Sequence, residues 1–246
     1  MCGRTGYVHS DFKAYGIERT PKDFRPIYNA APSMRLPQIF VKDGKKDVGL
    51  FKFGLVPFWS KTPTVKFSTI NAMAEKIFTS PVYRMPIHKH RSLTPVDFYF
   101  EWKELTDGTK QPYLFRLKSH ESFALGSIWD IWKDAEEKEF PSFSIITTEP
   151  NAIAAKYHRR MPLIVPKKHW DTWLDDKLSE EEIKQIMIPF PHPQDMDVFP
   201  VRKKLNSPAN QEQDVIEKVD ESPFLILCRY LPSPTPTVNA RGSRKI

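Results

Sequence analysis

The chain carries two hairpin patterns, and they constrain its fold more than any other feature of the sequence. Asp-Gly pairs favour the tight turns that join neighbouring antiparallel strands. Each pair here separates two strand-like runs: Leu36–Lys42 and Val48–Val56 flank Asp43-Gly44, while Arg91–Leu105 and Gln111–Leu117 flank Asp107-Gly108. Further strands are predicted at Phe123–Trp132, Phe143–Thr147, Val198–Val201 and Phe224–Leu231.

Helical patterns are short and lie between or after the strands. Ser179 and Glu182 form a capping box that opens one helix. His169–Leu174 places apolar side chains on one helical face, and Thr148 is a cap for a short helix that ends near His158. Weaker helical patterns cover residues 10–20 and Ile70–Phe78. Hairpins outnumber any βαβ pattern, so we predict an α+β fold with mostly antiparallel pairing.

Composition narrows the classes of protein. A length of 246 residues suits one large domain or two small ones. The two cysteines, Cys2 and Cys228, give no disulfide framework, which favours a reducing compartment. The sequence shows no signal peptide and no long apolar run, so we expect a cytoplasmic protein without a membrane span. Residues 232–246, rich in Pro, Thr, Ser and Arg, are expected to form a disordered tail after a domain at 1–231.

The balance of charge favours a polyanionic partner. Lys and Arg number 37 against 30 Asp and Glu, which gives a formal net charge of +7. Such an excess suits nucleic acid, although many basic proteins bind none. Several other chemistries lack their motifs, because the sequence contains no Gly-rich phosphate loop, no His-Glu-x-x-His and no Cys-x-x-Cys.

Cys2 has the most distinctive chemistry in the chain. Aminopeptidases remove a methionine that precedes a side chain as small as cysteine, and removal of Met1 would leave Cys2 as the N-terminal residue. An N-terminal cysteine carries an amine and a thiol on adjacent carbons, and both are partly nucleophilic near neutral pH. A 1,2-aminothiol condenses with an aldehyde to a Schiff base and then closes to a thiazolidine. An ordinary cysteine at position 2 is the alternative interpretation.

A set of short strings carries a resemblance to a known family. In chain order they are Met1-Cys2-Gly3-Arg4, Tyr28-Asn29-Ala30-Ala31-Pro32, Gly54-Leu55-Val56-Pro57-Phe58-Trp59, Ile70-Asn71-Ala72, Phe98-Tyr99-Phe100-Glu101-Trp102, Gln111-Pro112 and His158-Arg159-Arg160-Met161-Pro162. In this order and spacing they resemble the SRAP family, the SOS-response-associated peptidases, also called abasic-site processing proteins. The resemblance covers roughly residues 1–219.

The resemblance implies a fold and a function. The fold is a single domain with a β-rich, barrel-like core, flanking helices and a positive channel for DNA. The function is a DNA damage response: binding of single-stranded DNA and covalent crosslinking of Cys2 to the aldehyde of an abasic site. The family is also described as removing its own Met1 and as having a lyase-type activity. No metal and no organic cofactor are expected, and we expect a monomer.

The same motifs imply the residues of the site. Besides Cys2, the catalytic candidates are Asn71, Glu101 and His158. Apolar neighbours would raise the pKa of Glu101 toward neutrality, whereas an exposed strand face is the alternative for this residue. The predicted helix end at His158 would favour its protonated ring. The DNA-binding candidates are Arg4, Pro32, Trp59, Arg84, Arg159 and Arg160. Arg159 or Arg160 could instead form a structural ion pair.

Two departures from the family pattern leave the function open. Met73 stands where the family usually has a DNA-contacting arginine, and Phe98 stands where glycine is usual, so the local backbone could differ. The sequence therefore leaves three functions: an abasic-site crosslinking enzyme, a peptidase that uses an N-terminal cysteine on other proteins, and a DNA-binding relative that has lost crosslinking.

Overall fold

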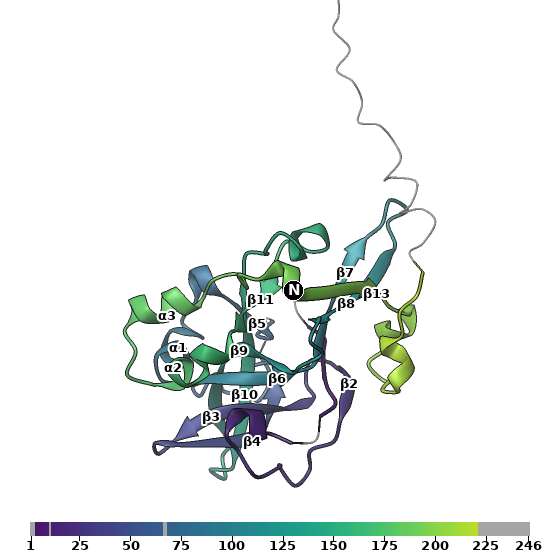
Figure 1. Cartoon of the computed structure of the whole chain (residues 1–246). Coiled ribbons are helices and arrows are strands. Elements are labelled where there is room, and N and C mark those ends of the chain that lie inside the picture. The colour runs from purple at the N-terminus through teal and green to yellow at the C-terminus, as the bar shows by residue number, and fades with distance from the viewer. Residues whose placement is uncertain (1–2, 10, 66–67, 221–246) are drawn as a thin grey trace, which may run out of the picture.

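The computed structural model describes residues 3–9, 11–65 and 68–220 (Figure 1). Cys2 lies outside the described residues, as do the predicted strand Phe224–Leu231, Cys228 and the predicted tail at 232–246. In the part of the chain that is described, no helix has the length and apolar character needed to cross a membrane.

Five strands close into a barrel, because they pair in the cyclic order β10, β4, β3, β6, β9 and back to β10. The strands are β3 (Arg35–Lys42), β4 (Lys45–Phe53), β6 (Arg91–Val96), β9 (Phe123–Lys133) and β10 (Glu139–Thr148). Only the β4–β10 contact of this ring is parallel. Short strands extend it: β5 (Asn71–Met73) and β11 (Met161–Pro162) pair with β10, and β12 (Ile164–Val165) pairs with β9.

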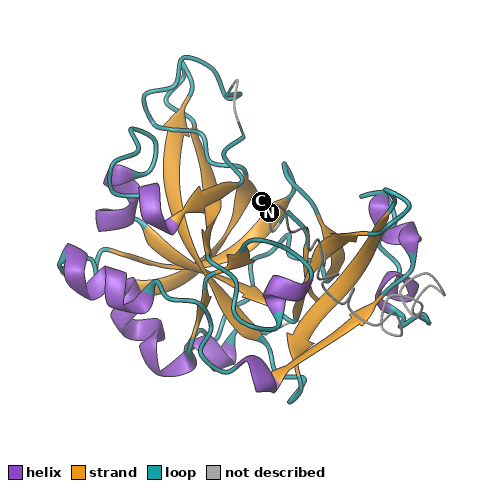
Figure 2. Cartoon of the chain, turned by 90° about the horizontal axis from the view of Figure 1, so that it is seen from above, coloured by secondary structure: helices purple, strands orange, loops and turns teal. Residues whose placement is uncertain are grey.

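A second, five-stranded antiparallel sheet lies beside the barrel (Figures 1 and 2). Its order is β13 (Met196–Pro200), β8 (Lys110–Leu117), β7 (Phe98–Glu104), β1 (Thr5–Tyr7) and β2 (Ile27–Ala30). The first strand of the chain is thus an inner strand, paired with β7 through Thr5 opposite Tyr99. The prediction of an α+β domain with a β-rich, mostly antiparallel core is confirmed.

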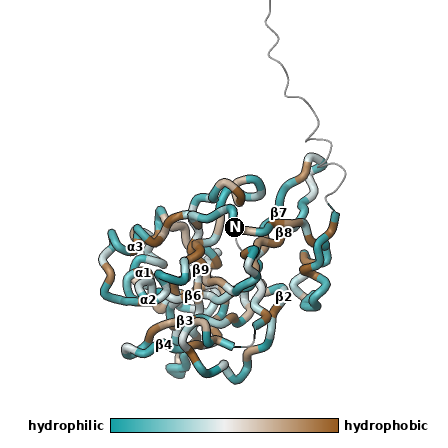
Figure 3. Tube along the Cα trace, in the orientation of Figure 1, coloured by the Kyte–Doolittle hydropathy of each residue, from teal (hydrophilic) through white to brown (hydrophobic). Residues whose placement is uncertain are grey.

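Three helices cover one side of the barrel (Figures 1 and 2): α1 (Arg84–Lys89), α2 (Trp170–Leu174) and α3 (Glu180–Ile186). Their residues Ile87, Trp173 and Ile183 share one buried cluster with Ile39 and Leu93 of the barrel strands. The alternate residues of those strands face the barrel interior, because neighbouring strand residues point to opposite faces. Figure 3 shows apolar stretches along β9 of the barrel and along β8 of the second sheet.

Aromatic rings fill the interior of the barrel. Phe40, Phe51 and Trp129 meet there with ring centroids 5.1 to 5.4 Å apart. Buried Gln38 also lies in the interior, and its amide donates to the Thr94 hydroxyl across β3 and β6. Every polar group of this kind needs a partner, because leaving it unpaired away from water costs about 1–3 kcal/mol.

Three helix predictions need correction. Of the helix predicted at residues 10–20, the described residues form only a 3-10 turn at Lys13–Tyr15. Ile70–Phe78 is not a helix, since Asn71–Met73 pairs with β10 as a strand and only Ala74–Lys76 forms a 3-10 turn. Tertiary pairing has overridden a weak local preference. Thr148 is not a helix cap, because it ends β10 opposite Met161.

The segment after Thr148 forms only a 3-10 turn at Ala154–Lys156. The side chain of Asn151 caps this turn, because its Oδ1 accepts from the N–H groups of Ile153 and Ala154. In contrast, the predicted capping box is present at α3, where Ser179 and Glu182 bond reciprocally.

Phe98, the residue that replaces the family's usual glycine, leaves β7 regular. Its ring lies over Gly6 of β1, which stands directly opposite it. A Cβ atom on Gly6 would lie 2.0 Å from Cε2 of Phe98. The absent side chain at Gly6 therefore makes room for the large side chain at position 98.

Arg91 is a buried cation that holds the ends of two helices. Its guanidinium donates to the carbonyl oxygens of Ile87 in α1 and of Trp173 and Asp175 at the end of α2. We expect Arg91→Met to lower the free energy of unfolding by roughly 2–4 kcal/mol, because these buried carbonyls would lose charged donors. Urea unfolding should show this loss, whereas Lys89→Met, at an exposed position of α1, should change stability little.

Candidate functional site

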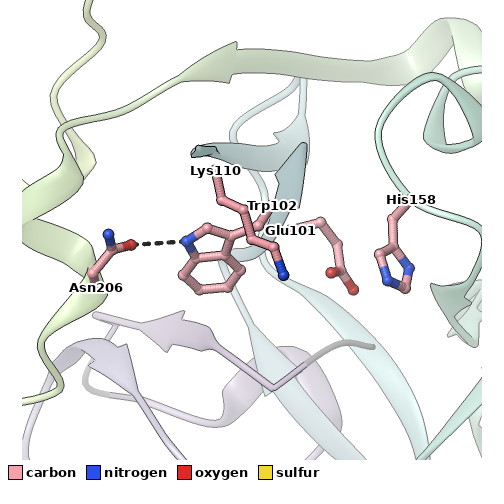
Figure 4. A pocket seen from close by; sticks show the side chains of 5 residues that line it. All are labelled: Glu101, Trp102, Lys110, His158 and Asn206. Atoms are coloured by element: carbon pink, nitrogen blue, oxygen red, sulfur yellow. Dashed lines mark hydrogen bonds between the residues drawn. The ribbon is translucent and has the colours of Figure 1, made fainter. Parts of the chain in front are cut away.

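A cavity of about 450 Å³ opens at the junction of the second sheet and the loop after β10. Its lining side chains are Glu101, Trp102, Lys110, His158 and Asn206 (Figure 4). Glu101 and His158 both line this cavity, and Figure 4 shows the carboxylate of Glu101 next to the ring of His158. The structure therefore brings together two of the predicted catalytic residues, which are 57 positions apart in the sequence.

Glu101 is a buried carboxyl group on β7. Its side of β7 is covered, because the neighbouring Tyr99 stacks on Phe115 with ring centroids 4.7 Å apart. Only 3% of Glu101 is exposed, and burial raises its pKa to about 7 from an ordinary value of 4.5. The exposed-face alternative is therefore wrong. Near neutral pH this carboxyl is populated in both protonation states, as a group that gives and takes protons requires.

His158 follows the 3-10 turn at Ala154–Lys156. Tyr157 packs on Tyr113 of β8, with 4.5 Å between ring centroids, and this contact holds the following residue at the cavity. The backbone of Arg160 contacts the ring at Nδ1, 3.1 Å away, so Nε2 is the nitrogen suited to proton transfer in the cavity.

The expectation that a helix end would favour protonated His158 is wrong. Burial lowers the pKa of His158, and the positive charges of Arg159 and Lys110 lower it further. The turn before it is also too short to supply a helix dipole. A neutral imidazole is therefore the dominant form of His158 at pH 7.

The start of β1 lies directly beside Glu101. The backbone N–H of Phe100 donates to the carbonyl of Arg4, and Thr5 pairs with Tyr99. Extending this antiparallel register by two residues places Gly3 level with Glu101. Gly3 is the first residue that the structure describes, so the described start of the chain lies beside Glu101.

Arg4 is held by the protein itself. Its guanidinium donates to Asn29 Oδ1 at 2.6 Å and to the carbonyls of Leu205 and Asn206, and it lies 5.8 Å from the centroid of the Trp102 ring. Burial lowers its pKa. These contacts tie β1 to the 3-10 helix at Lys203–Asn206, and a phosphate contact by Arg4 stays a prediction.

Asn71 and Arg160 are not among the residues that line the cavity of Glu101 and His158. Asn71 lines a separate cavity together with Met73, the residue in the place of the family's arginine. Arg160 forms a bidentate ion pair with Glu75 at 2.8 and 2.9 Å and also donates to the Thr147 carbonyl. Of the two alternatives for Arg160, the structure shows the ion pair.

The other DNA-binding candidates lie on the surface. Arg159 is exposed next to His158, and Arg84 is exposed at the first residue of α1. Pro32 is exposed in the loop between β2 and β3. Trp59 is 53% exposed in the loop after β4, beside Phe58 at 60%. A core position for Trp59 is therefore excluded.

Sequence reasoning missed three residues of the cavity: Trp102, which was named only as part of a motif, Lys110 and Asn206. Lys110 begins β8, which pairs with β7, and its side chain reaches into the cavity (Figure 4). The sequence could have indicated Lys110, because this residue directly precedes the motif Gln111-Pro112. Asn206 accepts a hydrogen bond from Trp102 Nε1 at 2.8 Å, and no signal in the sequence marked it.

The protein therefore combines a closed barrel with a cavity that holds a buried carboxyl group and an imidazole, close to the first strand of the chain. Comparisons with known proteins identify the family. The family model described as SOS response associated peptidase (SRAP) matches residues 1–208. The chain belongs to the SRAP family.

Relatives with names and structures support this membership. Abasic site processing protein YoaM of Bacillus subtilis is 33% identical over 223 residues, which cover 88% of this chain and 98% of that protein. YoqW of the same organism is 32% identical, with 88% and 99% covered. The crystal structure of a Bacteroides thetaiotaomicron protein has a TM-score of 0.77 at 28% identity, covering 89% of this chain and all of that one.

Proposed function

We propose that this protein processes abasic sites in single-stranded DNA by forming a covalent crosslink through Cys2. The observation that carries the proposal is the buried Glu101 carboxyl, with a pKa of about 7, in one cavity with His158 and beside the start of β1. The names of the Bacillus subtilis relatives support the choice of abasic sites as the substrate.

The chemistry begins after removal of Met1. The amine of Cys2 attacks the aldehyde of the ring-opened sugar and gives a carbinolamine, which loses water to form a Schiff base. The thiol then adds to the C=N carbon, and its proton passes to the nitrogen, which closes the thiazolidine. One molecule of water is released overall, and no oxidant or reductant is needed.

Glu101 and His158 divide the proton transfers in this proposal. Protonated Glu101 gives a proton to the departing hydroxyl of the carbinolamine, and the resulting carboxylate takes one from the amine. Neutral His158 acts as a base at Nε2 in the tautomer whose Nδ1–H donates to the Arg160 carbonyl. Lys110 and Arg159 keep the cavity positive, which suits the phosphates that flank the sugar. Asn71 is proposed to orient the amine or the sugar hydroxyls from β5.

Removal of Met1 by the protein itself and a lyase-type cleavage of the DNA strand belong to the same proposal. A Schiff base acidifies the proton on the neighbouring sugar carbon, so a base at the site can lead to strand cleavage. The same acid–base pair would serve the hydrolysis that exposes Cys2. The second candidate function is a peptidase that acts on other proteins, which the description of the family as a peptidase favours.

A denaturing gel tests the proposal against its alternatives. Purified protein is incubated with a labelled single strand that contains one abasic site, heated in detergent and separated. A heat-stable shifted band is expected for the crosslinking enzyme only. A peptidase or a non-crosslinking DNA-binding relative would leave the labelled strand at its free position, and that result would contradict the proposal.

Trp59 is expected to stack on a DNA base. Its loop is fixed to the barrel, because Asp130 and Ser142 accept from the N–H groups of Phe58 and Val56 and Trp132 donates to the carbonyl of Ser60. We expect Trp59→Ala to weaken single-strand binding by about 1–3 kcal/mol without unfolding. Fluorescence anisotropy measures this loss, and Ile188→Ala, a similarly exposed apolar position, serves as the control. If Trp59→Ala and Ile188→Ala bind the single strand with equal affinity, Trp59 is not part of the DNA interface.

A further inference from the structure

Two positive side chains face each other at one end of the β3–β4 hairpin. Arg35 and Lys52 are directly opposite residues of the antiparallel pair. Like charges in this arrangement destabilise a sheet. Within residues 3–9, 11–65 and 68–220, neither side chain forms an ion pair with a carboxylate. The pair therefore presents uncompensated positive charge, and this is the electrostatic pattern of an anion site.

The pair lines a cavity of about 350 Å³. Trp132, Phe140 and Pro141 line the same cavity with apolar and aromatic surface. Lys52 Nζ donates to the Pro63 carbonyl at 3.2 Å, which fixes the ammonium group at the cavity. Two cations and aromatic rings around one cavity suit a nucleotide unit, because phosphate and base need these two kinds of contact.

This cavity continues toward β5. A second cavity of about 210 Å³ shares Ser33, Lys52 and Pro63 with it. Pro32 and Ile70 line that second cavity. Ile70 directly precedes Asn71, so the concave surface extends from the Arg35–Lys52 pair to the edge of β5.

We propose that Arg35 and Lys52 bind phosphates of the DNA strand that runs on from the abasic site, with one base against Phe140 and Trp132. This inference rests on the proposed function for the identity of the strand. The continuity of the two cavities favours an extended strand over a free nucleotide. The cavity lies outside the one lined by Glu101 and His158, so it contributes affinity and leaves the proton transfers unchanged.

The test uses the double variant R35Q/K52Q and an undamaged single strand of about 20 nucleotides. Each phosphate contact on a single strand contributes about 0.7 to the salt slope of log K, so two contacts give a slope change of about 1.4. At 0.1 M salt this corresponds to a loss of affinity of roughly 10- to 30-fold. Fluorescence anisotropy over a salt series measures both quantities.

The hairpin offers a matched control in K42Q/K45Q. Lys42 and Lys45 are also directly opposite each other on β3 and β4, but they flank the turn at the other end, roughly 23 Å away by strand rise. Both double variants remove one like-charge pair and two positive charges. The control should keep the wild-type salt slope, and circular dichroism should show both variants folded.

The outcomes separate this inference from the proposed function. Equal salt slopes and affinities for R35Q/K52Q and K42Q/K45Q would overturn the phosphate site. A different result would point to a free nucleotide as the ligand. The wild type would bind adenosine monophosphate, R35Q/K52Q would not, and the salt slope for the long strand would be the same in both proteins. This result would overturn the proposal that the pair binds a DNA strand. If the wild type forms no adduct with abasic DNA, the proposed function fails, and the slopes with undamaged DNA still decide the role of the pair.

Discussion

Replacing Cys2 by alanine is expected to abolish the heat-stable adduct with abasic DNA. Cys2 supplies both atoms that close the thiazolidine, the amine nitrogen and the thiol sulfur. An N-terminal alanine keeps the amine and loses the thiol, so the reaction stops at the Schiff base. Borohydride reduces a Schiff base to a stable amine. The variant should therefore give a shifted band only when borohydride is present.

The other cysteine of the chain provides a control for this prediction. Cys228→Ala removes a thiol as well and should form the adduct at the wild-type rate, because Cys228 has no role in the proposed chemistry. Intact-mass measurement of the wild type should show that active protein lacks Met1. A heat-stable adduct from Cys2→Ala without borohydride, or full activity with Met1 retained, would contradict the crosslinking mechanism.

Glu101→Gln is expected to slow adduct formation by about 10²–10⁴-fold, because general acid–base groups typically contribute this much. Glutamine keeps the shape of the side chain and cannot exchange protons. The adduct itself should still form, since both of its bonds come from Cys2. Time courses on denaturing gels measure the rate, and Glu104→Gln, at the exposed end of the same strand, is the matched control.

The pH dependence should identify Glu101 as the titrating group. The rate of the wild type should change with an apparent pKa near 7, the value to which burial raises this carboxyl. That inflection should be absent in Glu101→Gln. A wild-type rate in the glutamine variant across the pH range would show that Glu101 is structural.

The pH dependence of protein stability gives an independent test of the raised pKa of Glu101. Its pKa rises from 4.5 in the unfolded chain to about 7 in the native state, so the native state binds more protons in this window. Its contribution to the free energy of unfolding therefore falls as pH rises from 4.5 to 7. Glu101→Gln should be more stable relative to the wild type at pH 8 than at pH 5, as thermal unfolding would measure.

The sequence by itself determined the strands that carry strong local signals. The hairpin around Asp43-Gly44 forms where the Asp-Gly pair and the flanking apolar runs predict it, and Ser179 with Glu182 caps α3 as predicted. These features depend on interactions among a few neighbouring residues, so a short stretch of sequence is enough to predict them. The ordered motifs likewise indicated the family, because each motif is itself local.

Only the tertiary structure decided how distant residues act together. Burial of Glu101 depends on Tyr99, Phe115 and the turn that carries Tyr157, and no window around position 101 contains all of them. His158 is neutral because of its burial and the cations around it, whereas local reasoning from a helix end predicted the protonated ring. The place of Lys110 and the opposition of Arg35 and Lys52 beside a cavity also require strand pairing. The pKa of a group and its neighbours across a sheet depend on long-range packing, and this packing is fixed only when the chain has folded.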